Sequence, residues 1–180
     1  MPESEELAQI IAGCKKSETD SFSQLIDMYS TRCYGYFYRL TGNSDISDEL
    51  LSRLFVKLVE KIHSFRGGSF EGWLFKVASN IFHDHLRDKQ RQKKLLQARI
   101  ERLQEQTEPA KNSVDNGVDQ LQIQLEKLDE DTRELIMLRF YSQLSFKEIA
   151  RMRAEPIGTT LSKLHRALKK LRKLVERKRL

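Results

Sequence analysis

The sequence of 180 residues contains little proline, glycine or cysteine. With three prolines and eight glycines in the whole chain, an architecture of many strands joined by tight turns is not expected. The two cysteines, Cys14 and Cys33, form no CxxC pair and no repeated spacing. Neither a zinc site nor a disulfide framework is therefore indicated, and we expect no metal and no other cofactor.

Long apolar runs are absent as well. No stretch approaches the roughly 20 apolar residues that a helix needs to cross a bilayer. The acidic segment 1–12 lacks the basic start and the apolar core of a signal peptide. We therefore expect a cytoplasmic protein with no membrane insertion.

Charge, in contrast, is abundant and unevenly distributed. Charged residues make up 32% of the chain, and the formal net charge is +6. Residues 66–104 carry 9 Lys and Arg against 4 Asp and Glu, and residues 139–180 carry 13 against 3. Between these basic blocks, residues 105–138 carry 3 Lys and Arg against 9 Asp and Glu. Two separate basic blocks suggest two contacts with a polyanion.

Apolar residues recur at steps of three and four, which predicts an all-α protein. In the first half the expected helices cover residues 5–15, 20–41, 47–63 and 69–87, and in the second half 120–128, 135–141, 145–152 and 159 onward. The polar run after Arg87 contains good helix formers and could prolong the fourth helix, although it has little to bury. Residues 108–119, EPAKNSVDNGVD, combine proline, glycine and polar residues as flexible linkers do. We assign residues 1–95 to a first helical domain, 96–119 to a flexible linker and 120–180 to a second domain.

Helix ends are indicated by residues that satisfy free backbone groups. Asp20 is the expected N-cap of the second helix, and Asp45 or Ser47 that of the third. Gly42 stands where a left-handed residue commonly ends a helix. Ser69 is the expected N-cap of the fourth helix, behind a turn that contains two adjacent glycines.

The stretch 65–87, FRGGSFEGWLFKVASNIFHDHLR, combines an apolar face with a polar stripe. The apolar face includes Phe70, Trp73, Leu74, Val77, Ala78 and Ile81. On another face Lys76, Asn80, His83 and Arg87 follow each other at helical spacing, so four donor-capable side chains share one side. Such a stripe suits nucleic acid, although an ordinary solvated helix face would show the same spacing.

The C-terminal part has the pattern of a helix-turn-helix. Ser145 and Glu148 have the spacing of a capping box at the start of a short helix. A break around 154–158 contains Pro156, and a long basic helix follows from Thr159. The alternative is a basic helix that merely keeps the chain soluble.

Three segments together resemble sigma factors of the extracytoplasmic-function class within the sigma-70 family. They are YSTRCYGYFYRLTGN, DELLSRLFVKLVEKIHSFRGGSFEGWLFKVASNIFHDHLR and LDEDTRELIMLRFYSQLSFKEIARMRAEPIGTTLSKLHRALKKL, and they cover about two thirds of the chain. The resemblance implies a protein that is not an enzyme but binds bacterial core RNA polymerase, recognises promoter DNA and assists strand opening. Its expected partners are core polymerase and double- and single-stranded promoter DNA. Whether an anti-sigma factor is a further partner stays open.

The resemblance also implies residue roles. The surface that contacts core polymerase would include Asp48, Glu49, Leu51, Ser52 and Phe55. The minus-ten element and the melted strand would meet Phe65, Arg66, Gly67, Ser69, Lys76, Asn80, His83 and Arg87. The minus-thirty-five duplex would meet Ser145, Thr159, Thr160, Ser162, Lys163, Arg166 and Lys170. The linker would thread through the polymerase toward the RNA exit path.

The chain departs from the family pattern at three places. Ser52-Arg53 stands where the family usually has a glutamine-glutamate pair, which reverses a charge at the expected polymerase contact. Thr160-Leu161 replaces an apolar residue followed by lysine, and Leu161 would either contact a thymine methyl group or be buried. Arg153-Ala154 replaces the usual leucine-glycine of the turn.

Two other functions are compatible with parts of the sequence. A polymerase-independent helix-turn-helix regulator would explain the second half, but it gives no purpose to the stripe beside Trp73. An enzyme would have to use His83 and His85 with Asp84. Residues two apart on a helix face different ways, so these histidines are a poor metal-binding pair.

Overall fold

The computed structural model describes residues 4–103 and 119–176, and within these ranges every regular element is a helix. The prediction of an all-α protein is thus confirmed. The elements are α1 (Ser4–Lys15), α2 (Thr19–Thr41), α3 (Ser44–Lys61), a 3-10 turn (Ile62–Ser64), α4 (Phe70–Leu103), α5 (Gln120–Glu126), α6 (Glu130–Tyr141), α7 (Phe146–Met152) and α8 (Ile157–Glu176). None of the described helices is both long and apolar enough to span a membrane.

Helix α2 begins at Thr19, two residues earlier than an N-cap at Asp20 would allow. Its N-cap is Glu18, in an extended conformation and without a side-chain cap, so the prediction of Asp20 as N-cap is wrong. Asp20 lies in the first turn instead, where its charge favours the positive end of the helix dipole. At the other end Gly42 adopts φ 66° and its N–H bonds to the Tyr38 carbonyl, as predicted.

Helix α3 is capped by Asn43, not by Asp45 or Ser47. The Asn43 side chain accepts a hydrogen bond from the Ile46 N–H at 2.9 Å. Ser47 lies inside the helix, buried, and its hydroxyl donates to the Asn43 carbonyl at 2.5 Å. Because three consecutive residues after Gly42, Asn43, Ser44 and Asp45, can each cap a helix, the sequence alone did not select the correct one.

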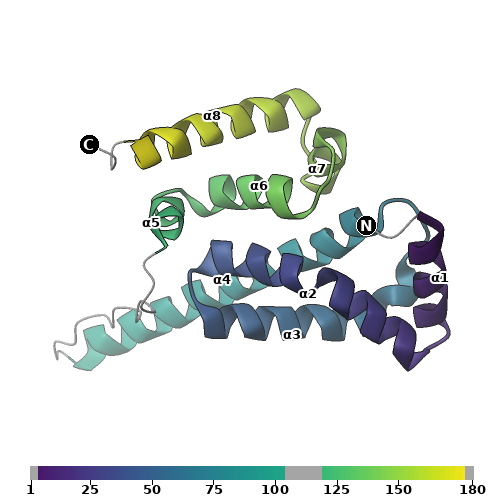
Figure 1. The fold of residues 1–180 in the computed structure, drawn as a ribbon. Coiled ribbons are helices and arrows are strands. Elements are labelled where there is room, and N and C mark those ends of the chain that lie inside the picture. Colours follow the sequence, from purple (N-terminus) through teal and green to yellow (C-terminus); the bar gives the residue numbers. More distant parts are fainter. Residues whose placement is uncertain (1–3, 104–118, 177–180) are drawn as a thin grey trace.

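Helix α4 is the longest described element and crosses two expected boundaries. It begins after Ser69, whose Oγ accepts from the Gly72 N–H at 3.0 Å, so the predicted N-cap is confirmed. The helix runs on to Leu103, past the predicted end of the first domain at residue 95, and its overhang projects beyond the body of the molecule (Figure 1). The segment assigned to the linker is thus helical at its start, while residues 104–118 lie outside the described residues.

The first domain packs α2, α3 and α4 against one another, with α1 across one end of α2. Phe75 and Phe82 of α4 belong to this core, although the periodicity argument did not include them. Phe75 is fully buried and meets Tyr36 of α2 edge-on, with ring centroids 5.4 Å apart. Trp73 is only partly buried and supports the core from its edge.

The second domain consists of α5 to α8 and lies over α2 and α4 (Figure 1). Its first helix is capped by Asp119, which forms an ion pair with Arg39 of α2. The predicted capping box at the start of α7 is confirmed, since the Ser145 amide donates to Glu148 at 2.8 Å and the Ser145 hydroxyl accepts from the Glu148 amide. The two domains therefore lie in direct contact in this structure, and we call this arrangement the closed pair.

The closed pair is joined by two arginines that bond to each other's helix. Arg32 of α2 donates from Nε and Nη2 to the Tyr141 carbonyl at the end of α6, at 3.0 and 2.9 Å. Arg133 of α6 donates from Nη1 to the Leu40 carbonyl near the end of α2, at 2.7 Å. A Cβ at Gly35 would lie 2.5 Å from the Tyr141 ring, so the absence of a side chain there permits the close approach.

Candidate nucleic-acid and polymerase interfaces

The turn before α4 exposes three of its four residues that were predicted to meet the minus-ten element and the melted strand. Gly67 and Gly68 adopt φ 101° and 86°, which side chains other than glycine rarely accept, and a Cβ at either would meet no atom within 4 Å. Arg66 and Ser69 are also exposed. The backbone of this turn is thus open to a ligand.

Phe65 is an exception, because its side chain is buried in this structure, and its contact with DNA stays a prediction. Its side chain is only 7% exposed. The ring packs against Phe70 and Trp73, with centroids 5.4 and 5.9 Å away. Phe65 thus forms the base of the turn, because the apolar ring gains more from this aromatic cluster than from solvent.

The predicted polar stripe exists on α4, but the second domain engages part of it. The Lys76 ammonium donates to the Met152 carbonyl of α7 at 2.7 Å, and His83 Nε2 lies 2.9 Å from Glu134 Oε2 of α6. Asn80 and Arg87 remain exposed. A strand could reach Asn80 and Arg87 in the closed pair, whereas Lys76 and His83 are already bonded.

Glu134 is the centre of the contact between the domains, and the sequence argument missed it. The residue is 1% exposed, and its Oε1 accepts hydrogen bonds from Tyr36 at 3.1 Å and Ser79 at 2.6 Å. Oε2 lies near His83 and 3.5 Å from Arg153. Burial, followed by the charge of Glu134, raises the pKa of Tyr36 well above its ordinary value. Glu134 directly precedes the apolar run 135–138, and an acidic residue beside such a run was the available signal.

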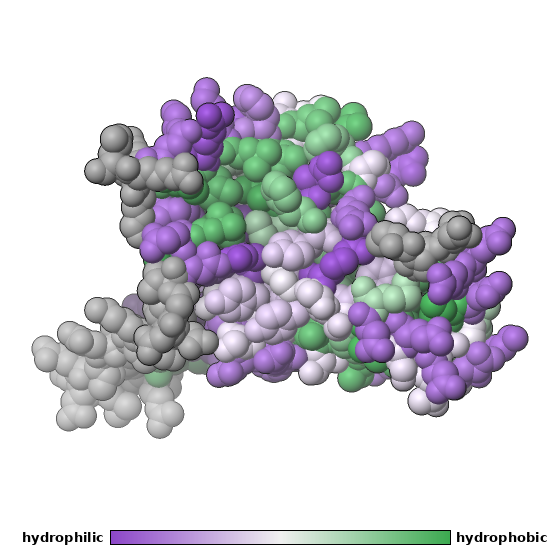
Figure 2. Space-filling view, in the orientation of Figure 1, coloured by the Kyte–Doolittle hydropathy of each residue, from purple (hydrophilic) through white to green (hydrophobic). Residues whose placement is uncertain are grey.

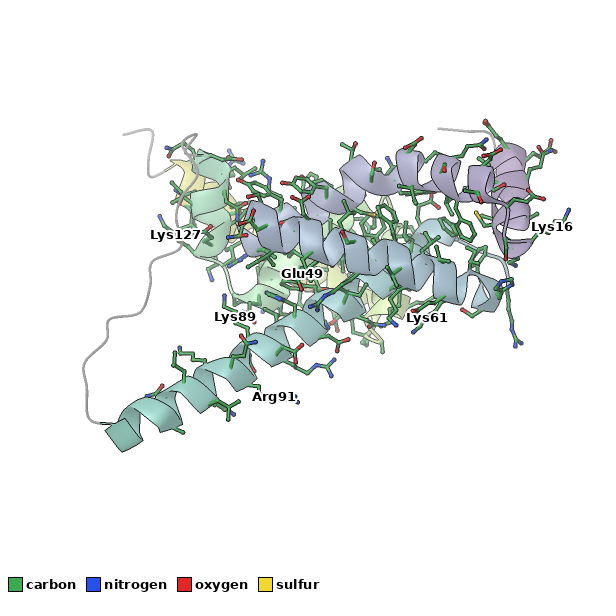
Figure 3. All side chains as sticks on the ribbon, turned by 90° about the horizontal axis from the view of Figure 1, so that it is seen from below. Lys16, Glu49, Lys61, Lys89, Arg91 and Lys127 are labelled. Carbon is green, nitrogen blue, oxygen red and sulfur yellow. The ribbon has the colours of Figure 1, made fainter. Side chains whose placement is uncertain are left out.

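The expected polymerase contact forms one exposed face of α3. Asp48, Glu49 and Ser52 are exposed, whereas Leu51 and Phe55 are half-buried against the core. Figure 3 shows Glu49 on α3 at the side where α4 passes. This geometry leaves the three polar residues available to a partner.

Arg53 changes the charge of this exposed face of α3, and two valines add apolar surface to it. The reversed charge of Arg53 is paired with Glu49 at 2.5 Å within the helix, and both side chains are about half exposed. Val56 and Val59, which sequence reasoning did not single out, are 56% and 48% exposed. They stand seven and ten residues after Glu49, so they continue its side of the helix as an apolar patch.

Helix α8 presents most of the residues predicted to bind duplex DNA. Ser162, Arg166 and Lys170 are exposed, and Thr159 is partly exposed. The Lys163 ammonium is bonded to Glu155 at 2.6 Å. The helix thus carries exposed cations on the side that was expected to face DNA.

Thr160 is buried in this structure, and its contact with DNA stays a prediction. Its exposure is 0%, and its hydroxyl donates to Glu155 at 2.9 Å. Burial acts to raise the pKa of Glu155, but the bonds from Lys163 and Thr160 lower it below its ordinary value. Leu161, the other residue that departs from the family pattern here, is 43% exposed. Of the two possibilities that the sequence left open for Leu161, burial is therefore not the one found in this structure.

Apolar side chains also gather on the second domain. Leu161, Leu168 and Val175 of α8 are at least 37% exposed and follow each other at seven-residue steps. Figure 2 shows apolar side chains on the face where α8 lies over α6. The cations predicted to meet DNA, Lys163, Arg166 and Lys170, and the exposed apolar residues therefore occupy different sides of α8.

The histidines considered for an enzyme do not converge. His83 faces Glu134 of α6, whereas His85 is partly buried, and burial followed by the charge of Lys89 lowers its pKa. Among residues 4–103 and 119–176, no cluster of His, Cys, Asp and Glu has the arrangement of a metal site.

The capping box predicts a pH dependence. Hydrogen bonds from the Ser145 hydroxyl and amide hold the pKa of Glu148 below its ordinary value of 4.5. The folded pKa lies below the unfolded one, so this stabilisation is complete above the unfolded pKa and is lost as pH falls through the folded pKa. We expect Glu148→Gln to lose less stability than the wild type between about pH 5 and pH 3 in urea unfolding. Equal losses would contradict the assignment.

Ala154 predicts a stabilising substitution. This residue of the turn between α7 and α8 adopts φ 53°, where a Cβ is unfavourable. Ala154→Gly should raise the free energy of unfolding by about 1 kcal/mol, as measured by urea unfolding. The control is Gly158→Ala, which introduces a Cβ into open space at the start of α8. A loss of stability in Ala154→Gly would show that the turn does not hold this conformation.

Comparison with known proteins assigns both halves of the chain. The family described as Sigma-70 region 2 matches residues 25–92, and the family described as Sigma-70, region 4 matches residues 124–173. The ECF RNA polymerase sigma factor SigW of Bacillus subtilis is 26% identical over 171 residues, covering 88% of this chain and 91% of that protein. The SigE factor of Mycolicibacterium smegmatis is 30% identical over 162 residues, but the chain spans only 60% of its length.

Solved structures show the same fold. Sigma factor RpoE of Bartonella quintana, solved with the anti-sigma factor NepR, has a TM-score of 0.69 at 22% identity, covering 88% of this chain and 98% of that one. CnrH, solved with the cytosolic domain of CnrY, has a TM-score of 0.67 at 21% identity, covering 93% and 95%. With both sigma regions matched in order and ECF factors among its relatives, the chain belongs to the extracytoplasmic-function group of sigma-70 family RNA polymerase sigma factors.

Proposed function

We propose that this sigma factor binds bacterial core RNA polymerase, recognises two promoter elements and assists strand opening. The observation that carries the proposal is the placement of two cationic surfaces on separate domains, the stripe on α4 and the outer side of α8. A duplex and a melted strand differ in shape and charge spacing, so separate surfaces suit the two tasks. The chain would supply binding energy, and the polymerase would supply catalysis in the cytoplasm.

The polymerase contact is proposed on α3. Its exposed face offers Asp48, Glu49 and Ser52, followed by the apolar pair Val56 and Val59. An apolar centre with a polar rim is typical of protein interfaces. The pairing of Arg53 with Glu49 keeps this face close to neutral despite the departure from the family pattern.

The melted strand is proposed to bind the turn 66–69 and the stripe. Opening a duplex costs a few kcal/mol per unstacked base, which a pocket or stacking surface must recover. Because Lys76 and His83 are bonded to α7 and α6 in the closed pair, full use of the stripe requires the two domains to separate.

An anti-sigma factor is proposed as a further partner. The support is that the Bartonella quintana structure is a complex of a sigma factor with the anti-sigma factor NepR, and that its fold extends over 88% of this chain. The exposed apolar side chains of α8 offer a surface for such a partner.

Gel filtration with core polymerase tests the proposal. We expect the chain to co-elute with core polymerase and the mixture to start transcription at defined sites, which mapping of transcript starts after overexpression would reveal. A helix-turn-helix regulator that works without polymerase would bind duplex DNA alone and would not co-elute. Failure to co-elute would exclude the proposed function.

Arg166→Ala should weaken binding of the polymerase complex to duplex minus-thirty-five DNA by about 1–3 kcal/mol if the side chain reads a base. Its guanidinium lies exposed on α8, bonded only to the Ser162 carbonyl at 3.2 Å in the described contacts. The control is Arg172→Ala, which removes the same charge from a different side of α8. Equal losses in both variants would indicate a general charge effect, and altered affinity for core polymerase would mean that the surfaces are exchanged.

A further inference from the structure

A cavity lies between α1 and the turn that precedes α4. Its volume is about 610 Å³, within the range of small-molecule sites. One wall is the segment 65–71, and the other is α1, through Leu7, Ala8, Ile11, Ala12 and Lys15. Helix α1 lies outside residues 25–92, where the sigma region 2 family matches, so no role is assigned to it.

The walls of this cavity differ in chemistry. Helix α1 contributes apolar side chains, and the small residues Ala8 and Ala12 stand one turn apart. The opposite wall has the unobstructed backbone of Gly67 and Gly68 and a carboxylate, Glu71, whose Oε1 accepts from Tyr29 at 2.7 Å. An unpaired nucleobase has apolar faces and an edge of donors and acceptors, so it matches one apolar wall and one polar wall.

Lys15 ties the two walls together. Its ammonium donates to the Phe65 carbonyl at 2.6 Å and lies 5.6 Å from the centroid of the Phe65 ring. The residues are 50 positions apart in the sequence, so this contact fixes the start of the turn to the end of α1. Because the ammonium is already hydrogen-bonded to the backbone of the turn, Lys15 would influence a bound base by fixing the conformation of the turn.

We propose that α1 is the second wall of a site for one unpaired nucleobase and that Lys15 is the positioning residue that sets its base preference. The inference rests on the proposed function, in which the turn 66–69 meets the melted strand. It adds to that function a role for α1, which lies outside the matched residues 25–92, and a role for Lys15 that involves no contact with DNA.

The test uses the full chain assembled with core polymerase and a randomised library of single-stranded DNA oligonucleotides, with the bound fraction sequenced. Lys15→Met keeps most of the side-chain length and removes the donor. The matched control, Lys16→Met, removes the same charge at the exposed neighbouring position, which Figure 3 shows pointing away from the body. We expect the preference at one base position to fall at least about threefold in Lys15→Met and to stay unchanged in Lys16→Met.

A second pair of variants changes the cavity without touching Lys15. Ala8→Leu fills the cavity from the α1 side and should also weaken the preference at that position. Gln9→Leu, on the exposed side of α1 and outside the cavity lining, should not. Thermal unfolding of each variant identifies any that do not fold.

The outcomes separate the inference from the function on which it rests. If the wild type enriches no base at any position, the turn does not select a base and its proposed role fails. If the wild type selects a base and folded Lys15→Met and Ala8→Leu select it equally well, only the role of α1 is overturned.

Discussion

Reversing the charges of two stripe residues together, as Lys76→Glu and Arg87→Glu, should reduce open-complex formation about 100-fold. Each reversed phosphate contact is expected to cost about 1.4 kcal/mol or more, and 1.4 kcal/mol corresponds to a factor of ten. The two cations stand at the ends of the stripe, so the substitution changes its whole length. Permanganate reactivity of unpaired thymines in the polymerase complex on promoter DNA measures the effect.

The control reverses two cations elsewhere on the same helix. Lys93→Glu with Lys94→Glu makes the same change of net charge on the exposed overhang of α4, beyond the labelled positions Lys89 and Arg91 (Figure 3). We expect this control to open the promoter nearly as well as the wild type. Similar losses in both double variants would mean that net charge, and not the stripe, supports opening. A pre-melted promoter should restore part of the stripe variant's activity, and a complete lack of restoration would contradict a role in melting.

Arg133→Ala should lower the free energy of unfolding by about 3 kcal/mol or more, since hydrogen bonds to a charged group contribute about 1.5–3 kcal/mol each and part of this is recovered from water. The guanidinium donates to the Leu40, Leu125, Glu126 and Leu128 carbonyls, at distances between 2.7 and 3.2 Å. Three of these carbonyls are at the end of α5 or just after it, and the fourth is near the end of α2. Urea unfolding measures the loss.

Two further variants show whether geometry or charge is responsible. Arg133→Lys keeps the charge, but a single ammonium cannot reach four carbonyls in the fork geometry of a guanidinium, so it should recover only part of the loss. Arg139→Ala removes an arginine from the same helix whose described contact is with the Phe146 ring, 5.2 Å away, and should cost about 1 kcal/mol or less. If Arg133→Ala lowers the free energy of unfolding no more than Arg139→Ala does, the hydrogen bonds of Arg133 do not hold the ends of α2 and α5 together.

Helix positions were predictable because apolar spacing reports burial directly. The stripe on α4, the turn with two glycines and the capping box at Ser145 were all expected from local patterns, and the structure contains them. Helix ends were less predictable where several residues could cap. At α3 the cap is Asn43, whereas Ser47 lies inside the helix and its hydroxyl bonds back to the Asn43 carbonyl.

The exposure of individual side chains could not be predicted where tertiary packing decides it. Phe65 and Thr160 both lie in segments that were expected to meet DNA, yet one joins an aromatic cluster and the other bonds to Glu155. Glu134 was missed because its partners, Tyr36, Ser79 and His83, lie between 51 and 98 residues away in the sequence. Such long-range contacts leave no periodic signal.

The bonds that Lys76 and His83 form with the second domain have a thermodynamic consequence. If a melted strand uses the same two side chains, the strand and the second domain are competing ligands of one surface. Linkage is reciprocal. If docking of the second domain lowers the affinity for the strand by some factor, binding of the strand lowers the equilibrium constant for docking by the same factor. Any partner that binds preferentially to the separated domains would therefore raise strand affinity without touching the strand.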